Sequence, residues 1–159
     1  LEYLFVLEEL FKKDKLNSVF STFLSQTLKQ IGLENIPEKY KEVVQTRIIS
    51  EEQNKIGKNI KLFIQINIGS EIQKSGIMID DLENFYTTCV RDFNLNIIGL
   101  MCLPPANIDP SNYFETMKNQ ANTLTLSELS MGMSADYLKA IEFGASYVRI
   151  GSKIFGERV

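Results

Sequence analysis

The sequence contains no histidine, and cysteine is almost as scarce. Without histidine there can be no Ser-His-Asp triad, no Cys-His nucleophile pair and no histidine-ligated metal. The two cysteines, Cys89 and Cys102, lack the CxxC spacing of a zinc site, and two lone thiols do not make a disulfide framework. We therefore expect two small buried thiols and no metal site.

Charge and hydropathy exclude further classes of protein. Lys and Arg number 17 against 20 Asp and Glu, a net charge of −3, so the basic footprint of a nucleic-acid-binding protein is missing. No apolar run is long enough to span a bilayer, and no secretory signal is visible. We expect a cytoplasmic protein with no nucleic-acid or membrane partner. Because the first residue is Leu1 and not methionine, we also expect a piece of a longer protein.

The chain does have enough apolar material for one packed domain, with 159 residues of which 44% are apolar and 23% charged. From about Pro37 onward, apolar runs alternate with amphipathic stretches, which is typical of βα units around a parallel sheet. About five parallel strands are predicted, at residues 42–46, 61–68, 96–101, 124–131 and 146–150. A complete (β/α)₈ barrel needs eight strands and about 250 residues. The predicted fold class is therefore α/β, a partial (β/α)₈ TIM-type barrel.

Two extra helices are predicted ahead of this barrel, over residues 1–11 and 17–31, because their apolar residues recur at helical spacing. Residues 1–36 are accordingly expected to form a helical amino-terminal segment, and residues 37–159 the barrel part. Ser50, with Gln53 three residues later, has the form of a capping box and predicts the start of a short helix.

Two loops carry the strongest signal for chemistry, and each is predicted to follow a strand and precede a helix. They are Ser130-Met131-Gly132-Met133-Ser134 and Arg149-Ile150-Gly151-Ser152. Unpaired N–H groups at a helix start attract anions, glycine lets the backbone approach them, and serine adds a hydroxyl donor. In (β/α)₈ barrels the loops after the last two strands often build a phosphate site. The alternative interpretation is a pair of ordinary tight βα turns.

Three polar side chains stand out near predicted strand ends. Arg149 interrupts an apolar strand, and it either faces solvent, or lies inside the barrel, or donates to a ring nitrogen or an anion at the ligand end. Asn67 ends an isoleucine-rich strand and either contacts a bound group or satisfies its own loop. Lys74, in the following loop, is either a phosphate or Schiff-base lysine or a solvated surface charge.

At this point four motifs resemble one family. They are Phe63-Ile64-Gln65-Ile66-Asn67-Ile68 with Lys74-Ser75-Gly76-Ile77; Gly99-Leu100-Met101; Leu129-Ser130-Met131-Gly132-Met133-Ser134-Ala135-Asp136; and Val148-Arg149-Ile150-Gly151-Ser152-Lys153-Ile154-Phe155-Gly156. Their order and spacing are similar to those of the pyridoxal phosphate homeostasis proteins, whose fold is related to the barrel domain of alanine racemase. The resemblance extends from about Ile60 to Val159.

The resemblance implies a barrel that binds and buffers pyridoxal 5'-phosphate without catalytic turnover. Ser134, Gly151 and Ser152 would hold the phosphate, and Arg149 would face the pyridine nitrogen. A cation there would keep that nitrogen unprotonated. The last two members of the implied site are Asn67 and Met133, which would lie beside the ring.

The chain departs from the family pattern in its first half. The family's Schiff-base lysine ends its first strand in a stretch like Val-Ser-Lys, and nothing in this chain matches that stretch. The expected function is thus pyridoxal phosphate binding by a truncated or split member that keeps the phosphate-binding half of the site. The alternatives are a non-functional remnant, a subunit that needs a second chain for the missing strands, and an amino-acid racemase, which would need the absent lysine.

Overall fold

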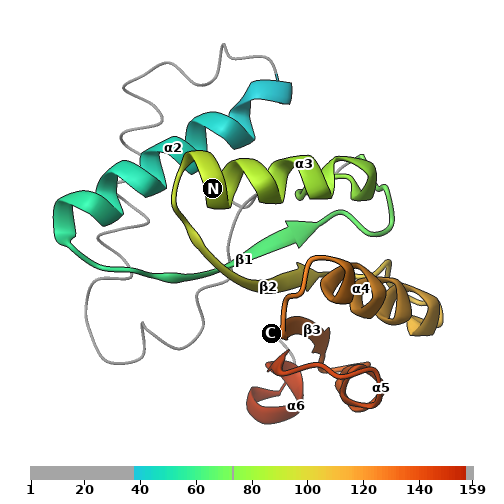
Figure 1. Cartoon of the computed structure of the whole chain (residues 1–159). Helices are drawn as coiled ribbons and strands as arrows, with labels where there is room; N and C mark the ends of the chain where they lie inside the picture. The colour runs from blue at the N-terminus through green and yellow to red at the C-terminus, as the bar shows by residue number, and fades with distance from the viewer. Residues whose placement is uncertain (1–37, 73, 157–159) are drawn as a thin grey trace.

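The computed structural model describes residues 38–72 and 74–156. Within this part, helices and strands alternate along the chain (Figure 1). The elements are α2 (Glu38–Ile56), β1 (Lys61–Ile66), α3 (Leu82–Thr87), β2 (Asn96–Cys102), α4 (Ser111–Thr123), β3 (Glu128–Met133), α5 (Tyr137–Glu142), β4 (Tyr147–Arg149) and α6 (Ser152–Phe155). A 3-10 turn precedes α3 at Ile79–Asp81, and a π-helical segment, Thr88–Asp92, prolongs it.

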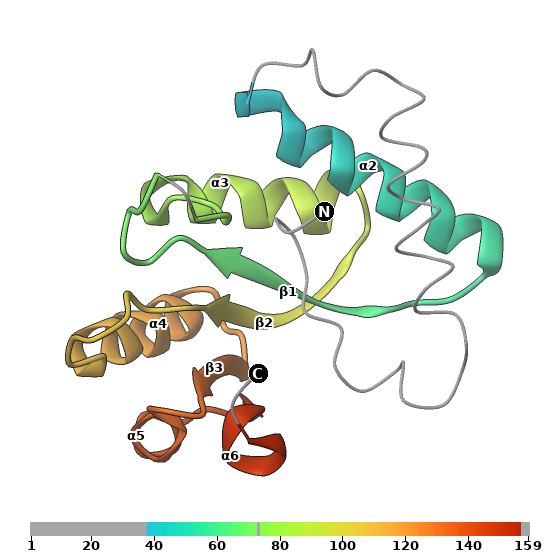
Figure 2. The ribbon, with the colours of Figure 1, turned by 180° about the vertical axis from the view of Figure 1, so that it is seen from behind.

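The strands form one parallel sheet in the order β1-β2-β3-β4. Helices α2 and α3 lie at the β1 end of this sheet, and α5 and α6 lie beyond β3 at the opposite end, as both views show (Figures 1 and 2). Sequential order with a helix between successive strands is the arrangement of a (β/α) barrel. The α/β class is confirmed, with four parallel strands matching part of a barrel.

The core lies mainly between the sheet and its helices. In β1 every residue after Lys61 is buried, as expected for a strand covered on both faces. Alternate residues Leu62, Ile64 and Ile66 pack into one cluster with side chains from α3 and α4. The largest fully buried members from those helices are Leu82, Phe114 and Met117.

The other face of the sheet is strongly curved. Phe63 of β1 and Tyr147 of β4 make an edge-to-face contact with ring centroids 5.1 Å apart. These strands stand three positions apart, which would separate them by about 14 Å in a flat sheet. Their side chains can meet only because the sheet bends around them, as it does in a barrel wall. The polar ends of the strands are thereby gathered around one concave face.

Two predictions about residues 42–53 are wrong. The predicted strand 42–46 lies inside α2, so the described sheet has four strands and not five. Ser50 and Gln53 also lie within α2 and do not start a helix. The Ser50 hydroxyl donates to the carbonyl of Phe93 at 2.7 Å, and the Gln53 side-chain oxygen accepts from the Ile60 N–H at 2.8 Å. Both side chains fasten α2 to the chain that enters the sheet.

The predicted helices 1–11 and 17–31 fall outside the described residues. Of the helices that the structure does describe, none is both long enough and apolar enough to cross a membrane. In residues 38–72 and 74–156, no three His, Cys, Asp or Glu side chains gather to hold a metal ion.

Candidate anion-binding site

The loops after β3 and β4 meet at the side chain of Ser134. Its hydroxyl oxygen accepts the N–H of Gly151 at 3.1 Å and lies 3.5 Å from the N–H of Lys153, which also donates to it. Ser134 is half-buried, whereas Gly151 and Lys153 are exposed. The two glycine-serine loops singled out in the sequence therefore belong to one site, with donors from two neighbouring strand ends. We call the turn at residues 132–134 the first corner, the turn at 151–153 the second corner, and the place where they meet the Ser134 corner.

Local chemistry fixes the shape of the first corner. The chain leaves β3 through Gly132, whose φ of +94° is readily reached only by glycine. The N–H of Met133 then donates to the Asp136 carboxylate at 2.6 Å, and the N–H of Asp136 donates back to the carbonyl of Met133 at 3.1 Å. These reciprocal bonds hold Ser134 at the outside of a tight turn.

The second corner is open. A Cβ added to Gly151 would meet no atom within 4 Å, so there is room for a group to approach its backbone. Ser152 is exposed, and its hydroxyl makes no hydrogen bond with any other described residue. Because α6 and α5 have only four and six residues, individual N–H groups and hydroxyls supply the donors here, more than a helix dipole does.

The structure shows which protein groups hold the Arg149 side chain. Its guanidinium points inward across the strand ends: Nη1 donates to the Ser130 hydroxyl at 2.5 Å and to the Ser130 carbonyl at 3.2 Å. Nη2 passes over β3 and donates to the carbonyl of Cys102, at the end of β2, at 2.8 Å. The side chain is thus a partly buried cation held in place at the strand ends, two residues before Gly151 in sequence and paired in register with Met133 of β3.

Asn67 satisfies its own loop. Its side-chain nitrogen donates to the carbonyls of Glu71 and Lys74 at 2.9 and 3.2 Å, and its side-chain oxygen accepts the N–H of Glu71 at 3.1 Å. The loop returns along β1, where Ile77 forms a parallel bridge with Ile66. Asn67 is 9% exposed, so its role in the fold is to shape the rim of the strand ends.

Lys74 joins two loops rather than standing in solvent. Its ammonium contacts the Glu71 carboxylate at 2.6 Å and donates to the carbonyls of Leu103 and Pro104 at 3.3 and 3.2 Å. The loop after β1 is therefore fastened to the loop after β2. Met133, in contrast, is 44% exposed at the end of β3 and leaves its side chain available at the surface.

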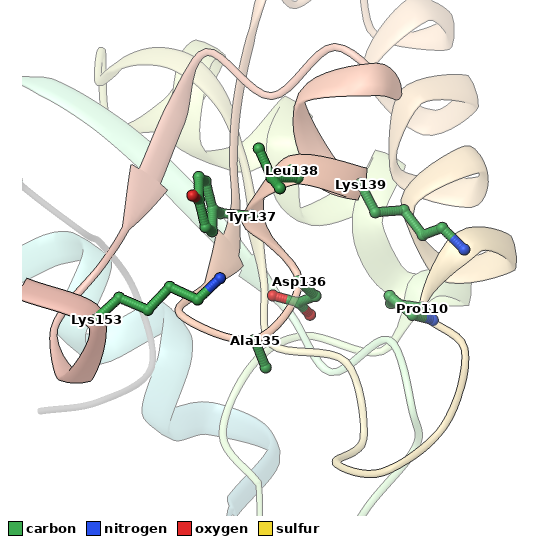
Figure 3. Close-up of a pocket in the computed structure, with 7 residues that line it drawn as sticks. All are labelled: Pro110, Ala135, Asp136, Tyr137, Leu138, Lys139 and Lys153. Atoms are coloured by element: carbon green, nitrogen blue, oxygen red, sulfur yellow. The ribbon is translucent and has the colours of Figure 1, made fainter. Parts of the chain in front are cut away.

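Sequence reasoning missed a hollow on the outer side of the Ser134 corner. It has a volume of about 310 Å³ and is drawn in Figure 3. The residues that line it are Pro110, Ala135, Asp136, Tyr137, Leu138, Lys139 and Lys153. The Lys153 ammonium lies 4.9 Å from the centroid of the Tyr137 ring. A lysine directly after the Gly-Ser pair was the only sequence signal for this hollow.

On the far side of the hollow, Lys139 contacts Asp109 at 3.0 Å. The Ser111 hydroxyl, which donates to Asp109 at 2.6 Å, together with Lys139 lowers the pKa of that carboxyl to about 2. The charge of Lys139 is therefore matched by a carboxylate that stays ionised over the physiological range.

The donors gathered at the corner suit a phosphate group. They are backbone N–H groups and serine hydroxyls on a curved parallel sheet, with a fixed guanidinium at the same strand ends. Phosphate oxygens accept several hydrogen bonds at once, and glycine-rich loops at strand ends are common phosphate sites. The fold and the corner together define a protein of the (β/α) barrel class with a cluster of hydrogen-bond donors at its strand ends.

Comparison with known proteins narrows this class. The sequence matches the family described as alanine racemase, N-terminal domain, over residues 17–159. It is 36% identical to the pyridoxal phosphate homeostasis protein of Aquifex aeolicus over 106 residues, which are 61% of this chain and 46% of that protein. The chain therefore belongs to the alanine racemase N-terminal domain family, and within it to the pyridoxal phosphate homeostasis proteins.

Further relatives agree with this assignment. The pyridoxal phosphate homeostasis protein of Synechocystis is 35% identical over 120 residues, covering 70% of this chain and 54% of that protein. The structure of PipY from Synechococcus elongatus with pyridoxal phosphate (PLP) bound superposes with a TM-score of 0.62 and 25% identity, covering 71% of this chain and 57% of PipY. The structure of PipY without PLP superposes with a TM-score of 0.65 and 26% identity, and the covered share of each chain is the same. The chain spans about half the length of the curated relatives it matches.

Proposed function

We propose that this chain binds pyridoxal 5'-phosphate and takes part in homeostasis of this cofactor. The observation that carries the proposal is the meeting of the two corners at Ser134, whose hydroxyl oxygen accepts the N–H groups of Gly151 and Lys153. Donors that converge on one oxygen atom can converge equally well on a phosphate oxygen. Ser134, Gly151 and Ser152 would hold the phosphate.

Arg149 would then face the pyridine nitrogen of the cofactor. Its guanidinium is held by Ser130 and by the Cys102 carbonyl at the end of β2, so it does not need the ligand to order it. A fixed cation beside the ring nitrogen disfavours protonation there. Met133 would flank the ring with its exposed side chain. Asn67 would also lie beside the ring, in the loop that its side-chain hydrogen bonds hold in shape.

When bound, the cofactor supplies an aldehyde and an electron-withdrawing ring. The related proteins that bind it are not known to catalyse a reaction with it. The motif that would bring the Schiff-base lysine has no match in this sequence, and Lys74 is engaged with Glu71 and two carbonyls. We therefore propose noncovalent binding and no racemase activity. Borohydride treatment followed by mass spectrometry should then show no added cofactor mass.

Equilibrium dialysis against pyridoxal phosphate tests the proposal directly. The wild-type chain should retain the cofactor, and Ser134→Ala should weaken retention about tenfold, because a phosphate loses one hydroxyl donor and the corner loses its link. Ser127→Ala is the matched control, because Ser127 is exposed and its hydroxyl donates, within the part of the chain that the structure describes, only to Glu128. Retention by Ser134→Ala equal to that of wild type would contradict the proposed phosphate site.

A second candidate is a subunit that binds the cofactor only together with another chain. The observation that favours it is the number of strands: the described sheet has four, and a closed barrel of this type has eight. Light scattering after gel filtration, with and without pyridoxal phosphate, separates the two candidates. A cooperative monomer that retains the cofactor would rule out the need for a second chain.

A further inference from the structure

Lys153 has two different groups close to the Ser134 corner. Its main-chain N–H donates to the Ser134 hydroxyl oxygen at 3.5 Å. Its side chain runs into the neighbouring hollow, where the ammonium lies 4.9 Å from the centre of the Tyr137 ring (Figure 3). The same residue thus contributes a neutral donor to the corner and a full positive charge beside it.

The charges around the hollow are distributed unevenly. Lys139 is paired with Asp109 at 3.0 Å, and the Asp136 carboxylate accepts the N–H of Met133 at 2.6 Å. Among the described residues, no carboxylate lies within 4.0 Å of the Lys153 ammonium, which lies over the face of the Tyr137 ring. A cation over a half-buried ring near the surface is held weakly, and the flexible lysine stem allows it to move to a stronger partner.

A phosphate at the corner would be such a partner. The hydroxyls and N–H groups there are neutral, whereas a phosphate monoester carries close to two negative charges at neutral pH. Arg149 is bound to Ser130 and Cys102 at the strand ends. The hollow that Lys153 enters is lined by Ala135 and Asp136, the two residues that directly follow Ser134, so the ammonium is near the corner and free of the strand-end contacts that hold Arg149.

We propose that Lys153 is a phosphate-binding residue, whose ammonium leaves the Tyr137 ring and pairs with the phosphate of the incoming ligand. This inference rests on the proposed function of the corner. The ligand class is an anionic phosphate monoester, and the hollow is the side from which the ammonium reaches it. Lys139 keeps its pairing with Asp109 and takes no part.

The test compares Lys153→Met with Lys139→Met in the full chain. Methionine keeps an unbranched side chain and removes the charge, and both positions line the same hollow. Affinities for pyridoxal phosphate, inorganic phosphate and unphosphorylated pyridoxal are measured by titration calorimetry at low and high salt. Thermal melting confirms that each variant folds.

Lys153→Met should weaken binding of pyridoxal phosphate and of inorganic phosphate about three- to tenfold at low salt, with a smaller effect at high salt. Pyridoxal affinity should not change, and Lys139→Met should stay within about twofold of wild type. If Lys153→Met binds the phosphate ligands as tightly as wild type, or if both variants lose the same affinity, the proposed role of Lys153 is wrong. Either result leaves the proposed function of the corner standing. Failure of the wild-type chain to bind either phosphate ligand would overturn the proposed function as well.

Discussion

At the scale of single residues, the arrangement around Arg149 depends on Ser130. Ser130 is fully buried, and its hydroxyl and carbonyl accept two hydrogen bonds from the guanidinium, at 2.5 and 3.2 Å respectively. A serine at this place in β3 contributes little apolar packing. Its value to the fold lies in accepting hydrogen bonds from a cation that would otherwise be costly to bury.

Ser130→Ala should therefore lower the free energy of unfolding by about 1–3 kcal/mol, because Nη1 of Arg149 loses a buried acceptor. Urea denaturation, read as a shift of the midpoint at constant slope, measures this loss. Ser127→Ala, at an exposed position just before β3, serves as the control and should be close to neutral. Equal midpoints for the two variants would show that the Arg149–Ser130 bond does not stabilise the fold.

At the scale of elements, the junction between β3 and α5 depends on Gly132. A Cβ at this position would lie 2.7 Å from the Cβ of Ala140 and 2.9 Å from the Cα of Tyr137, so the helix packs directly on the glycine. Gly144 has the same φ of +94°, but a Cβ there would meet nothing within 4 Å. Substitutions at these two glycines can therefore be compared to separate the cost of backbone strain from the cost of steric contact.

Gly144→Ala should cost about 1–2 kcal/mol of unfolding free energy, from the left-handed backbone alone. Gly132→Ala should cost about 1–3 kcal/mol more, because α5 must also move away from β3. Thermal melting of both variants measures the difference. If the two variants melt at the same temperature, close packing of α5 against β3 is not what Gly132 provides.

Among the helices and strands, two buried strands were predicted well from the sequence. The strands at 61–66 and 96–102 were found because long apolar runs bounded by turns are characteristic of buried parallel strands. The strand at 42–46 was wrong because β-branched residues have only a weak preference, which packing overrides. In α2, buried Thr46, Ile48 and Ile49 hold this segment in a helix.

The candidate site was predicted in part. Spacing alone placed Ser134 and Gly151 at the ends of neighbouring strands, where the structure joins them. Spacing could not say which way Arg149 faces, because either face of a barrel strand can hold a long side chain. The hollow around Lys153 could not be predicted beyond the presence of that lysine, since it forms only when the residue before α4, the turn before α5, α5 itself and α6 pack together.

At the scale of the whole molecule, the two thiols report on global opening. Cys89 and Cys102 are both fully buried, and burial raises the pKa of each thiol to about 12. In the native state the reactive thiolate is therefore scarce at neutral pH, and reagent cannot reach it. In the unfolded chain both thiols have an ordinary pKa and full access.

Labelling with a thiol reagent at pH 8 should accordingly be slow for the folded chain and should reach two thiols per chain in denaturant. Addition of pyridoxal phosphate should slow native labelling further, since a ligand of the folded state reduces the open population. Rapid native labelling of Cys102, identified by peptide mapping, would show that the end of β2 opens separately from the rest.

The parallel bridge between Ile66 and Ile77 has a consequence for solubility. An exposed strand border offers unpaired peptide groups to other chains and can begin fibrous association. Here the N–H of Ile77 donates to the carbonyl of Gln65 at 2.9 Å, and its carbonyl accepts the N–H of Asn67 at 3.0 Å. The chain's own backbone thus occupies these peptide groups at the carboxyl end of β1, so a strand of another molecule cannot pair with them.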